Sequence, residues 1–158
     1  MIIEREELAT LIPHRGRMSF ITRVKDYDLE AWNLCAECEV GRNDLFYDPA
    51  LDAVPAWVGF EFIAQAISAL TGLWLRENNK EPKIGFILSV SSMRIDIPSF
   101  KAGSIPEVTV RKTGVIDVIH SFEGEIYLEG KKVMEGKLTV MDAKDEQIEA
   151  FKKGILLK

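Results

Sequence analysis

The chain has 158 residues, of which 47% are hydrophobic and 28% charged, and its formal net charge is −5. This length fits a single domain that buries a core without disulfides. The negative net charge argues against a nucleic-acid-binding protein, because such proteins cluster lysine and arginine. The N-terminus has no basic segment followed by an apolar stretch and a cleavage site, so we expect a cytoplasmic protein.

The first part of the chain predicts a short helix and two strands. The helix covers residues 4–12, and Pro13 with the Gly16 turn ends it. Residues 18–24 and 30–40 alternate between apolar and polar side chains as strands do. An irregular segment with several aspartates follows.

A long apolar helix is predicted from Pro55 to about residue 77. Proline suits the first helical position, where its missing N–H costs nothing. Between residues 53 and 75 the only charged residue is Glu61, and that length approaches what a membrane span requires. Pro55, Glu61 and Gln65 within it, and the lack of aromatic or basic belts, favour instead a soluble helix that protein covers on most sides. We therefore expect no membrane span.

The second half of the chain is dominated by predicted strands, which we expect to form a four-strand meander. A tight turn at residues 129–131 joins the last two. The strands are expected at residues 84–97, 107–113, 116–128 and 133–141. The tail, residues 143–158, is predicted to be helical. We expect residues 1–158 to form one domain with its core at about residues 11–142.

A helix that is apolar all round needs a cover that curves around it. A strongly curved antiparallel sheet provides this cover, and a second copy of the chain can cover the remaining flank. The sequence therefore predicts an α+β protein with the hot-dog fold, in which a curved sheet wraps one central helix. We expect a homodimer.

The candidate chemistry lies on the long helix, where Glu61, Gln65 and Ser68 share one stripe. An ionised carboxylate among apolar side chains costs several kcal/mol unless it has a partner, and burial raises its pKa toward neutrality. Such a group suits general acid–base catalysis. Two other interpretations remain open: Glu61 points to solvent or pairs with Arg94, and Gln65 satisfies a buried backbone group.

The start of this helix offers a second feature. The first N–H groups of a helix lack partners, so those of Ala56 and Trp57 suit the carbonyl oxygen of a thioester. We expect Ala56, Trp57 and Phe60 to contact the substrate. His14, in a loop, is a candidate base, although a hydrogen bond that anchors the loop is the more common role of such a histidine.

Cys35 and Cys38 have the spacing of a redox pair or half a zinc site. They lie on a predicted strand, where positions three apart point to opposite faces, and no second cysteine pair completes a zinc site. We expect no metal and no cofactor.

Several motifs resemble the FabZ/FabA-type 3-hydroxyacyl-(acyl carrier protein) dehydratases. Residues 11–15 (LIPHR) with residues 21–24 (ITRV) resemble the N-terminal pattern of that family. The helix sequence PAWVGFEFIAQ, residues 55–65, is similar to its P-G-x-x-x-x-E-A-x-A-Q, and residues 128–139 resemble its last hairpin. The wording of the helix is most similar to the dehydratase-like proteins associated with aryl-polyene clusters.

This resemblance implies a hot-dog dimer that removes water reversibly from a 3-hydroxyacyl thioester. The substrate would be carried on acyl carrier protein or coenzyme A, and a second dehydratase chain is a possible hetero-partner. By position, Glu61 matches the catalytic carboxylate of the family and Gln65 the glutamine one turn later. Ala56 matches the glycine whose N–H holds the thioester carbonyl.

One departure bears on activity: Tyr47 stands where the family has its catalytic histidine. The leading hypothesis is a dehydratase in which Glu61 acts as acid and base, with Tyr47, Asp48 or His14 in place of the missing group. A non-catalytic acyl-carrier-binding subunit and a hot-dog thioesterase, in which a carboxylate alone activates water, are the alternatives.

Overall fold

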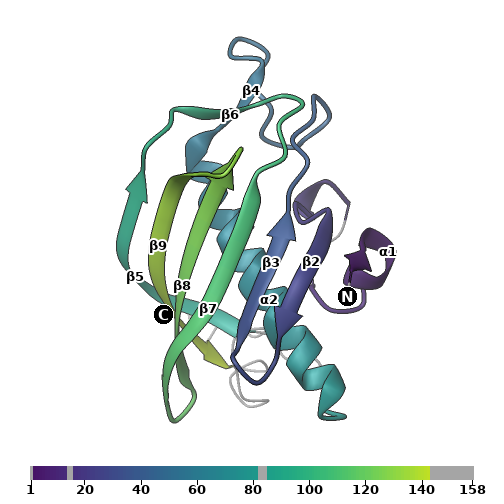
Figure 1. Ribbon diagram of the computed structural model, residues 1–158, viewed down its shortest axis with the longest axis vertical. Helices are drawn as coiled ribbons and strands as arrows, with labels where there is room; N and C mark the ends of the chain where they lie inside the picture. Colours follow the sequence, from purple (N-terminus) through teal and green to yellow (C-terminus); the bar gives the residue numbers. More distant parts are fainter. Residues whose placement is uncertain (1, 14–15, 82–84, 143–158) are drawn as a thin grey trace, which may run out of the picture.

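The computed structural model describes residues 2–13, 16–81 and 85–142. His14 and the C-terminal tail predicted for residues 143–158 lie outside the described residues. Within the described part, a large antiparallel sheet curves around one long helix, α2 (Gly59–Glu77) (Figure 1).

The main sheet has seven strands in the order β1-β2-β3-β7-β8-β9-β5, and every neighbouring pair is antiparallel. Its strands are β1 (Ile3–Glu4), β2 (Arg23–Asp28), β3 (Asn33–Glu37), β5 (Gly85–Ile95), β7 (Glu107–Ile116), β8 (Ile119–Leu128) and β9 (Lys131–Asp142). A separate pair of short strands, β4 (Ala53–Pro55) and β6 (Ser99–Lys101), lies at the N-terminal end of α2. A short helix, α1 (Arg5–Leu8), follows β1.

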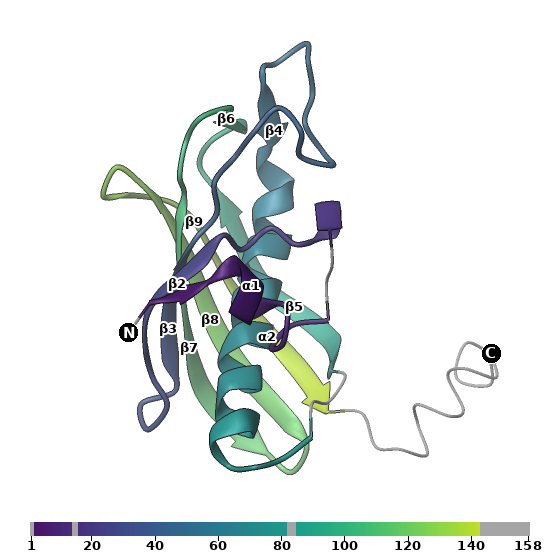
Figure 2. The same cartoon turned by 90° about the vertical axis from the view of Figure 1, so that its right-hand side faces the viewer.

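Helix α2 lies on the concave side of the sheet, as the view in Figure 2 shows. Ile63, Ala66 and Leu70 are completely buried along it. By length and composition the segment Ala56–Glu77 could cross a membrane, but 61% of its most apolar window is buried inside the protein. That burial is what a core helix requires, and the expected α+β hot-dog architecture is confirmed.

The helix approaches the sheet most closely at Gly124 of β8. A Cβ atom built at Gly124 would lie 2.4 Å from Cγ2 of Ile63. A side chain at this position would therefore push the helix away from the sheet. Gly124 is thus a packing requirement of the fold.

The strand order differs from the expected four-strand meander. The last three strands do form a meander, β7-β8-β9, but β5 pairs with β9 and β7 pairs with β3. The chain crosses from β5 to β7 through β6 at the end of the sheet. A single sequence gives strand ranges but not which strands pair, because antiparallel partners of similar length have the same alternating pattern.

The predicted N-terminal strands were displaced. Residues 18–22 do not form a strand: β2 begins only at Arg23, and backbone groups of Met18 and Phe20 bond to a side chain described below. The second strand starts at Asn33 rather than residue 30, since the Asp28 carboxylate accepts the N–H groups of Glu30 and Ala31 at 3.0 Å and holds them in a turn.

The start of the helix also differs from the prediction. Pro55 ends β4, and Ala56–Val58 form a 3-10 turn before α2 begins at Gly59. The C-terminal end at Glu77 agrees with the sequence. The turn between β8 and β9 is confirmed as well, with positive φ at Glu129 and Gly130.

The two cysteines are free thiols on opposite faces of the chain, Cys38 buried and Cys35 partly so. Burial raises the pKa of Cys35 to about 12, helped by the neighbouring Glu107 carboxylate. Burial likewise raises the pKa of Cys38. Both groups therefore stay protonated at neutral pH, which supports the interpretation as structural residues; Cys35 lies in β3, and Cys38 follows the end of that strand at Glu37.

We predict that Gly124→Ala destabilises the protein by about 1–3 kcal/mol, because the new methyl group overlaps Ile63. Gly114→Ala in β7 is the matched control, since nothing lies within 4 Å of its Cβ position. It should change the free energy of unfolding by no more than about 0.5 kcal/mol. Urea denaturation of both variants checks this, and equal losses of stability would contradict the packing role of Gly124.

We also predict that the native thiols react slowly with a thiol-specific disulfide reagent near neutral pH. A pKa of about 12 leaves Cys35 with roughly a thousandfold less thiolate than an unperturbed cysteine. The reaction should accelerate by about that factor when guanidinium unfolds the chain. Reaction of the folded protein at the rate of a free thiol would contradict this account of the cysteines.

Candidate active site

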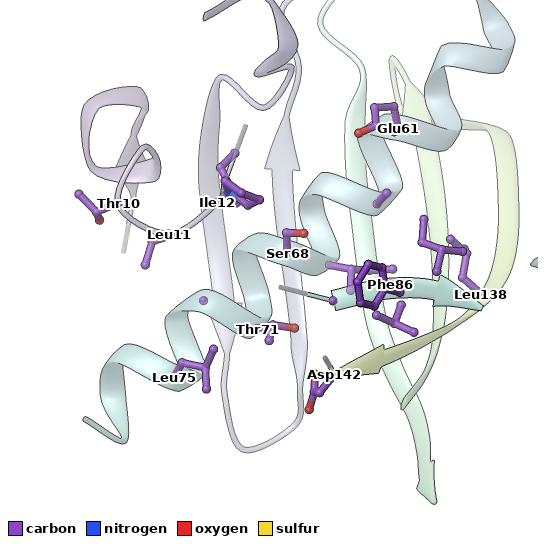
Figure 3. A pocket seen from close by; sticks show the side chains of 17 residues that line it. Thr10, Leu11, Ile12, Glu61, Ser68, Thr71, Leu75, Phe86, Leu138 and Asp142 are labelled. Carbon is purple, nitrogen blue, oxygen red and sulfur yellow. The ribbon is translucent and has the colours of Figure 1, made fainter. Parts of the chain in front are cut away.

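A cavity of about 540 Å³ runs along one side of α2 (Figure 3). Figure 3 shows Glu61 at one end of it and Asp142 at the other, with Phe86 and Leu138 between them. The walls come from α2, from the segment after α1, and from β5 and β9. The residues that line it are Thr10, Leu11, Ile12, Pro13, Glu61, Ala64, Ile67, Ser68, Thr71, Gly72, Leu75, Gly85, Phe86, Ile87, Leu138, Val140 and Asp142.

The helical side of the cavity follows the spacing of an α-helix. Glu61, Ala64, Ser68, Thr71 and Leu75 lie three or four residues apart, so they share one face. Most of the other walls are apolar. The cavity therefore matches a long, largely apolar ligand that meets one carboxylate at the start of the helix.

One close contact brings the N-terminal segment against this helix. A Cβ atom at Gly72 would lie 2.5 Å from the carbonyl oxygen of Leu11. The absence of a side chain at Gly72 lets the backbone of residues 10–13 lie directly on α2. This wall of the cavity depends on that approach.

Glu61 is half-buried, in the first turn of α2, and its carboxylate lies at the edge of the cavity. Gln65 Nε2 lies 3.4 Å from Glu61 Oε1 and donates a hydrogen bond to it. The alternative pairing with Arg94 is wrong, since Arg94 pairs with Asp96 and Glu135. The first turn of α2 thus places Glu61 at a cavity that residues of this same chain form.

Gln65 does not face the cavity; it is completely buried on the neighbouring side of the helix. Its Oε1 accepts the backbone N–H of Phe20 at 2.8 Å, and its Nε2 donates to the carbonyl oxygen of Met18 at 2.7 Å. The expectation that Gln65 satisfies buried backbone groups is therefore met. Because the same amide also contacts Glu61, it connects the N-terminal segment to the carboxylate.

At the start of the helix, a backbone N–H that was expected to bind the thioester carbonyl has a partner within the protein. The N–H of Ala56 donates to the carbonyl oxygen of Pro98 at 3.1 Å, so it is not available to a thioester as the sequence suggested. The short pairing of β4 with β6 continues to this residue and occupies its donor. The Trp57 side chain is 58% exposed and meets Phe46 edge-on. Neither these residues nor Phe60 lines the cavity of this chain.

Tyr47 does not line the cavity either. Its hydroxyl donates to Asp52 Oδ1 at 2.5 Å, and Arg42 holds the same carboxylate through two hydrogen bonds of 3.0 Å. The bond to Asp52 raises the pKa of Tyr47, which makes the phenol a poorer acid. In this chain Tyr47 anchors the loop before α2, and the Asp48 carboxylate accepts the N–H of Ala50 in a turn.

Sequence reasoning missed the far half of the cavity. Asp142 and Phe86 line it, yet Phe86 was predicted only as part of a strand and Asp142 lay just after the last predicted strand. Their place depends on β5 pairing with β9, which brings Gly85 opposite Asp142. The sequence carried no local signal for that pairing.

A model of the ApeP-like family, ApeP dehydratase, matches residues 6–153. The 3-hydroxyacyl-[acyl-carrier-protein] dehydratase FabZ of Chlamydia pneumoniae is 31% identical over 96 residues, which cover 59% of this chain and 62% of that enzyme. The chain thus spans less than two thirds of that relative. FabZ of Chlamydia trachomatis serovar L2 is 24% identical over 146 residues, covering 90% and 94%.

Two solved structures show the same fold. One is the dehydratase heterocomplex ApeI:P from Xenorhabdus doucetiae, with a TM-score of 0.82, 22% identity, and coverage of 91% of this chain and 95% of that one. The other is a putative thioesterase, a phenylacetic acid degradation-related protein from Ralstonia eutropha JMP134. Its TM-score is 0.59 at 19% identity, with coverage of 75% and 82%.

We predict that Gln65→Leu destabilises the protein by about 1–3 kcal/mol, because it leaves the buried N–H of Phe20 and the carbonyl of Met18 without their partner. The Phe20 amide should also exchange its hydrogen faster in native-state NMR. Ser68→Ala, on the cavity side of the next turn, is the control and should leave Phe20 protected. If the Phe20 amide exchanged its hydrogen in Gln65→Leu as slowly as in the wild type, Gln65 would not be what holds the N-terminal segment on α2.

Proposed function

Because the chain belongs to the ApeP-like dehydratase family, we propose that it removes water reversibly from 3-hydroxyacyl thioesters and that Glu61 exchanges the proton. The observation that carries this proposal is the half-buried carboxylate of Glu61 at the end of a cavity shaped for an acyl chain. The bond from Gln65 orients that carboxylate. Binding of the acyl chain along α2 would exclude water from it.

The chemistry needs one proton moved from the carbon next to the thioester carbonyl to the hydroxyl oxygen on the adjacent carbon, as the bond between that carbon and its oxygen breaks and a carbon–carbon double bond forms. The Glu61 carboxylate takes the proton from the carbon next to the thioester carbonyl. The resulting carboxylic acid then gives it to the hydroxyl on the adjacent carbon, which leaves as water and returns Glu61 to its ionised form. A single carboxyl can serve as base and acid in turn when both atoms lie on its side of the substrate.

We propose further that a second dehydratase chain completes the site. Strand β5 pairs only with β9 among the described strands, and Ile87, Leu88 and Val90 on it are more than 40% exposed. Ile87 also lines the cavity, so a chain bound along β5 would close that wall. The similar protein from Xenorhabdus doucetiae is part of a dehydratase heterocomplex, which supports a hetero-partner as the chain that binds along β5.

A non-catalytic partner subunit is the second candidate function. The observation that favours it is the engagement of Tyr47 with Asp52, which leaves Glu61 and Asp142 as the only ionisable side chains among the described residues that line the cavity. In that case the chain would bind the acyl carrier thioester and shape the partner's site. Both proposed functions require an acyl thioester of either acyl carrier protein or coenzyme A.

We predict that Glu61→Gln lowers the rate of enoyl-thioester formation from a 3-hydroxyacyl thioester by at least about a hundredfold. The variant should unfold at nearly the same denaturant concentration as the wild type. Glu77→Gln, at the exposed end of the same helix, is the matched control and should keep the wild-type rate. The assay measures the chain alone and mixed with a dehydratase partner.

The outcomes separate the candidates. Full activity of Glu61→Gln would contradict the catalytic role of Glu61. Acyl-thioester binding without turnover, in the chain alone and in the mixture, would favour the non-catalytic subunit. Release of free thiol from a saturated acyl thioester would favour a thioesterase.

A further inference from the structure

We propose that Asp142, held by His120, forms a polar subsite at the far end of the cavity and accepts a hydrogen bond from a hydroxyl group at the distal end of the acyl chain. This inference rests on the proposed acyl-binding function and names the kind of chain the cavity selects. Chains with a hydroxylated end would bind in preference to plain alkyl chains of the same length.

The first support is the position of Asp142. It is the last residue of β9 and lines the cavity, and Figure 3 shows it at the opposite end from Glu61, below Thr71. A carboxylate at the end of an apolar channel costs free energy when an alkyl chain removes its water, because no hydrogen bond replaces the water. A ligand hydroxyl at the same place replaces it.

The second support is that the carboxylate is built into place. His120 Nε2 lies 3.0 Å from Asp142 Oδ2, and the side chains are only 20% and 32% exposed, respectively. The backbone N–H of Asp142 donates to the carbonyl oxygen of Val118. Among the hydrogen bonds of the described residues, the Asp142 side chain uses Oδ2, and none involves its Oδ1.

The charges around Asp142 favour a neutral donor over a cationic one. Lys112 interacts electrostatically with the Asp142 carboxylate, and its ammonium lies 3.9 Å from the centroid of the Trp32 ring. With the Lys112 ammonium already near the carboxylate, a ligand ammonium would meet a like charge. A hydroxyl meets no such repulsion.

The length of the cavity limits how long a bound acyl chain can be. Ten helical residues separate Glu61 from Thr71, which is about 15 Å along the helix axis. An extended backbone advances about 1.2 Å per bond, so an acyl chain of about twelve atoms spans this distance. Ser68 and Thr71 lie along the path, and their hydroxyls suit a chain that is not purely alkyl.

The test uses non-hydrolysable acyl-pantetheine amides of about twelve carbons, one with a terminal hydroxyl and one with a terminal methyl group. Isothermal titration calorimetry on the full chain should give about tenfold tighter binding of the hydroxylated ligand, as expected for a hydrogen bond to a charged group. Asp142→Leu should abolish or reverse this preference. Asp117→Asn, in the exposed turn before β8, should preserve it.

If Asp142→Leu does not fold, Asp142→Asn replaces it in the test, because asparagine keeps the shape of the aspartate side chain and removes its charge. It should reduce the preference several-fold. Equal affinities of the two ligands in the wild type, an unchanged preference in both Asp142 variants, or no binding of either ligand would overturn the proposal. A preference in a protein without dehydratase turnover would support this subsite while the proposed function fails.

Discussion

The contact between α2 and the concave face of the sheet determines the rest of the structure. The helix is apolar on nearly every side, so it is stable only where protein covers it. Gly124 lets the sheet lie directly on Ile63, and Gly72 lets the backbone of Leu11 lie on the other side of the helix. Along another flank of the helix the described residues leave a cavity, and Glu61 lies at its start.

The amide of Gln65 then connects this packing to the candidate chemistry. Buried polar groups are stable only when they are hydrogen-bonded, and Gln65 satisfies Met18 and Phe20 as it contacts Glu61. The same side chain therefore holds the N-terminal segment and orients the carboxylate. A residue with a structural role thus contacts the carboxylate that we propose to be catalytic.

The sequence predicted the fold because its main determinants are local. The apolar run around Glu61 and the alternating strands of the second half are visible in single segments, and both were confirmed. The pairing of β5 with β9 was not predictable, because register and strand order depend on contacts between distant segments. The displaced start of β2 has a similar cause, since a side chain from α2 replaces ladder bonds there.

The candidate site was predicted in part, for the same reason. Glu61 and Gln65 follow from helical spacing, but the direction of Gln65 and the bond of Ala56 to Pro98 depend on tertiary packing. Asp142 enters the site only through the strand order. The resemblance to dehydratases supplied a catalytic position for Tyr47, whose hydroxyl donates to Asp52 in this chain, and its role in catalysis stays a prediction.

The central claim is that an acyl thioester lies along α2 with its reacting carbons at Glu61. A crystal structure with a non-hydrolysable 3-hydroxyacyl-pantetheine amide tests it most directly. The account predicts the 3-hydroxyl within about 2.6–3.2 Å of a Glu61 carboxylate oxygen, with the acyl chain passing Ser68 toward Thr71. A ligand bound elsewhere, with the Glu61 carboxylate turned to open water beside an empty cavity, would contradict it.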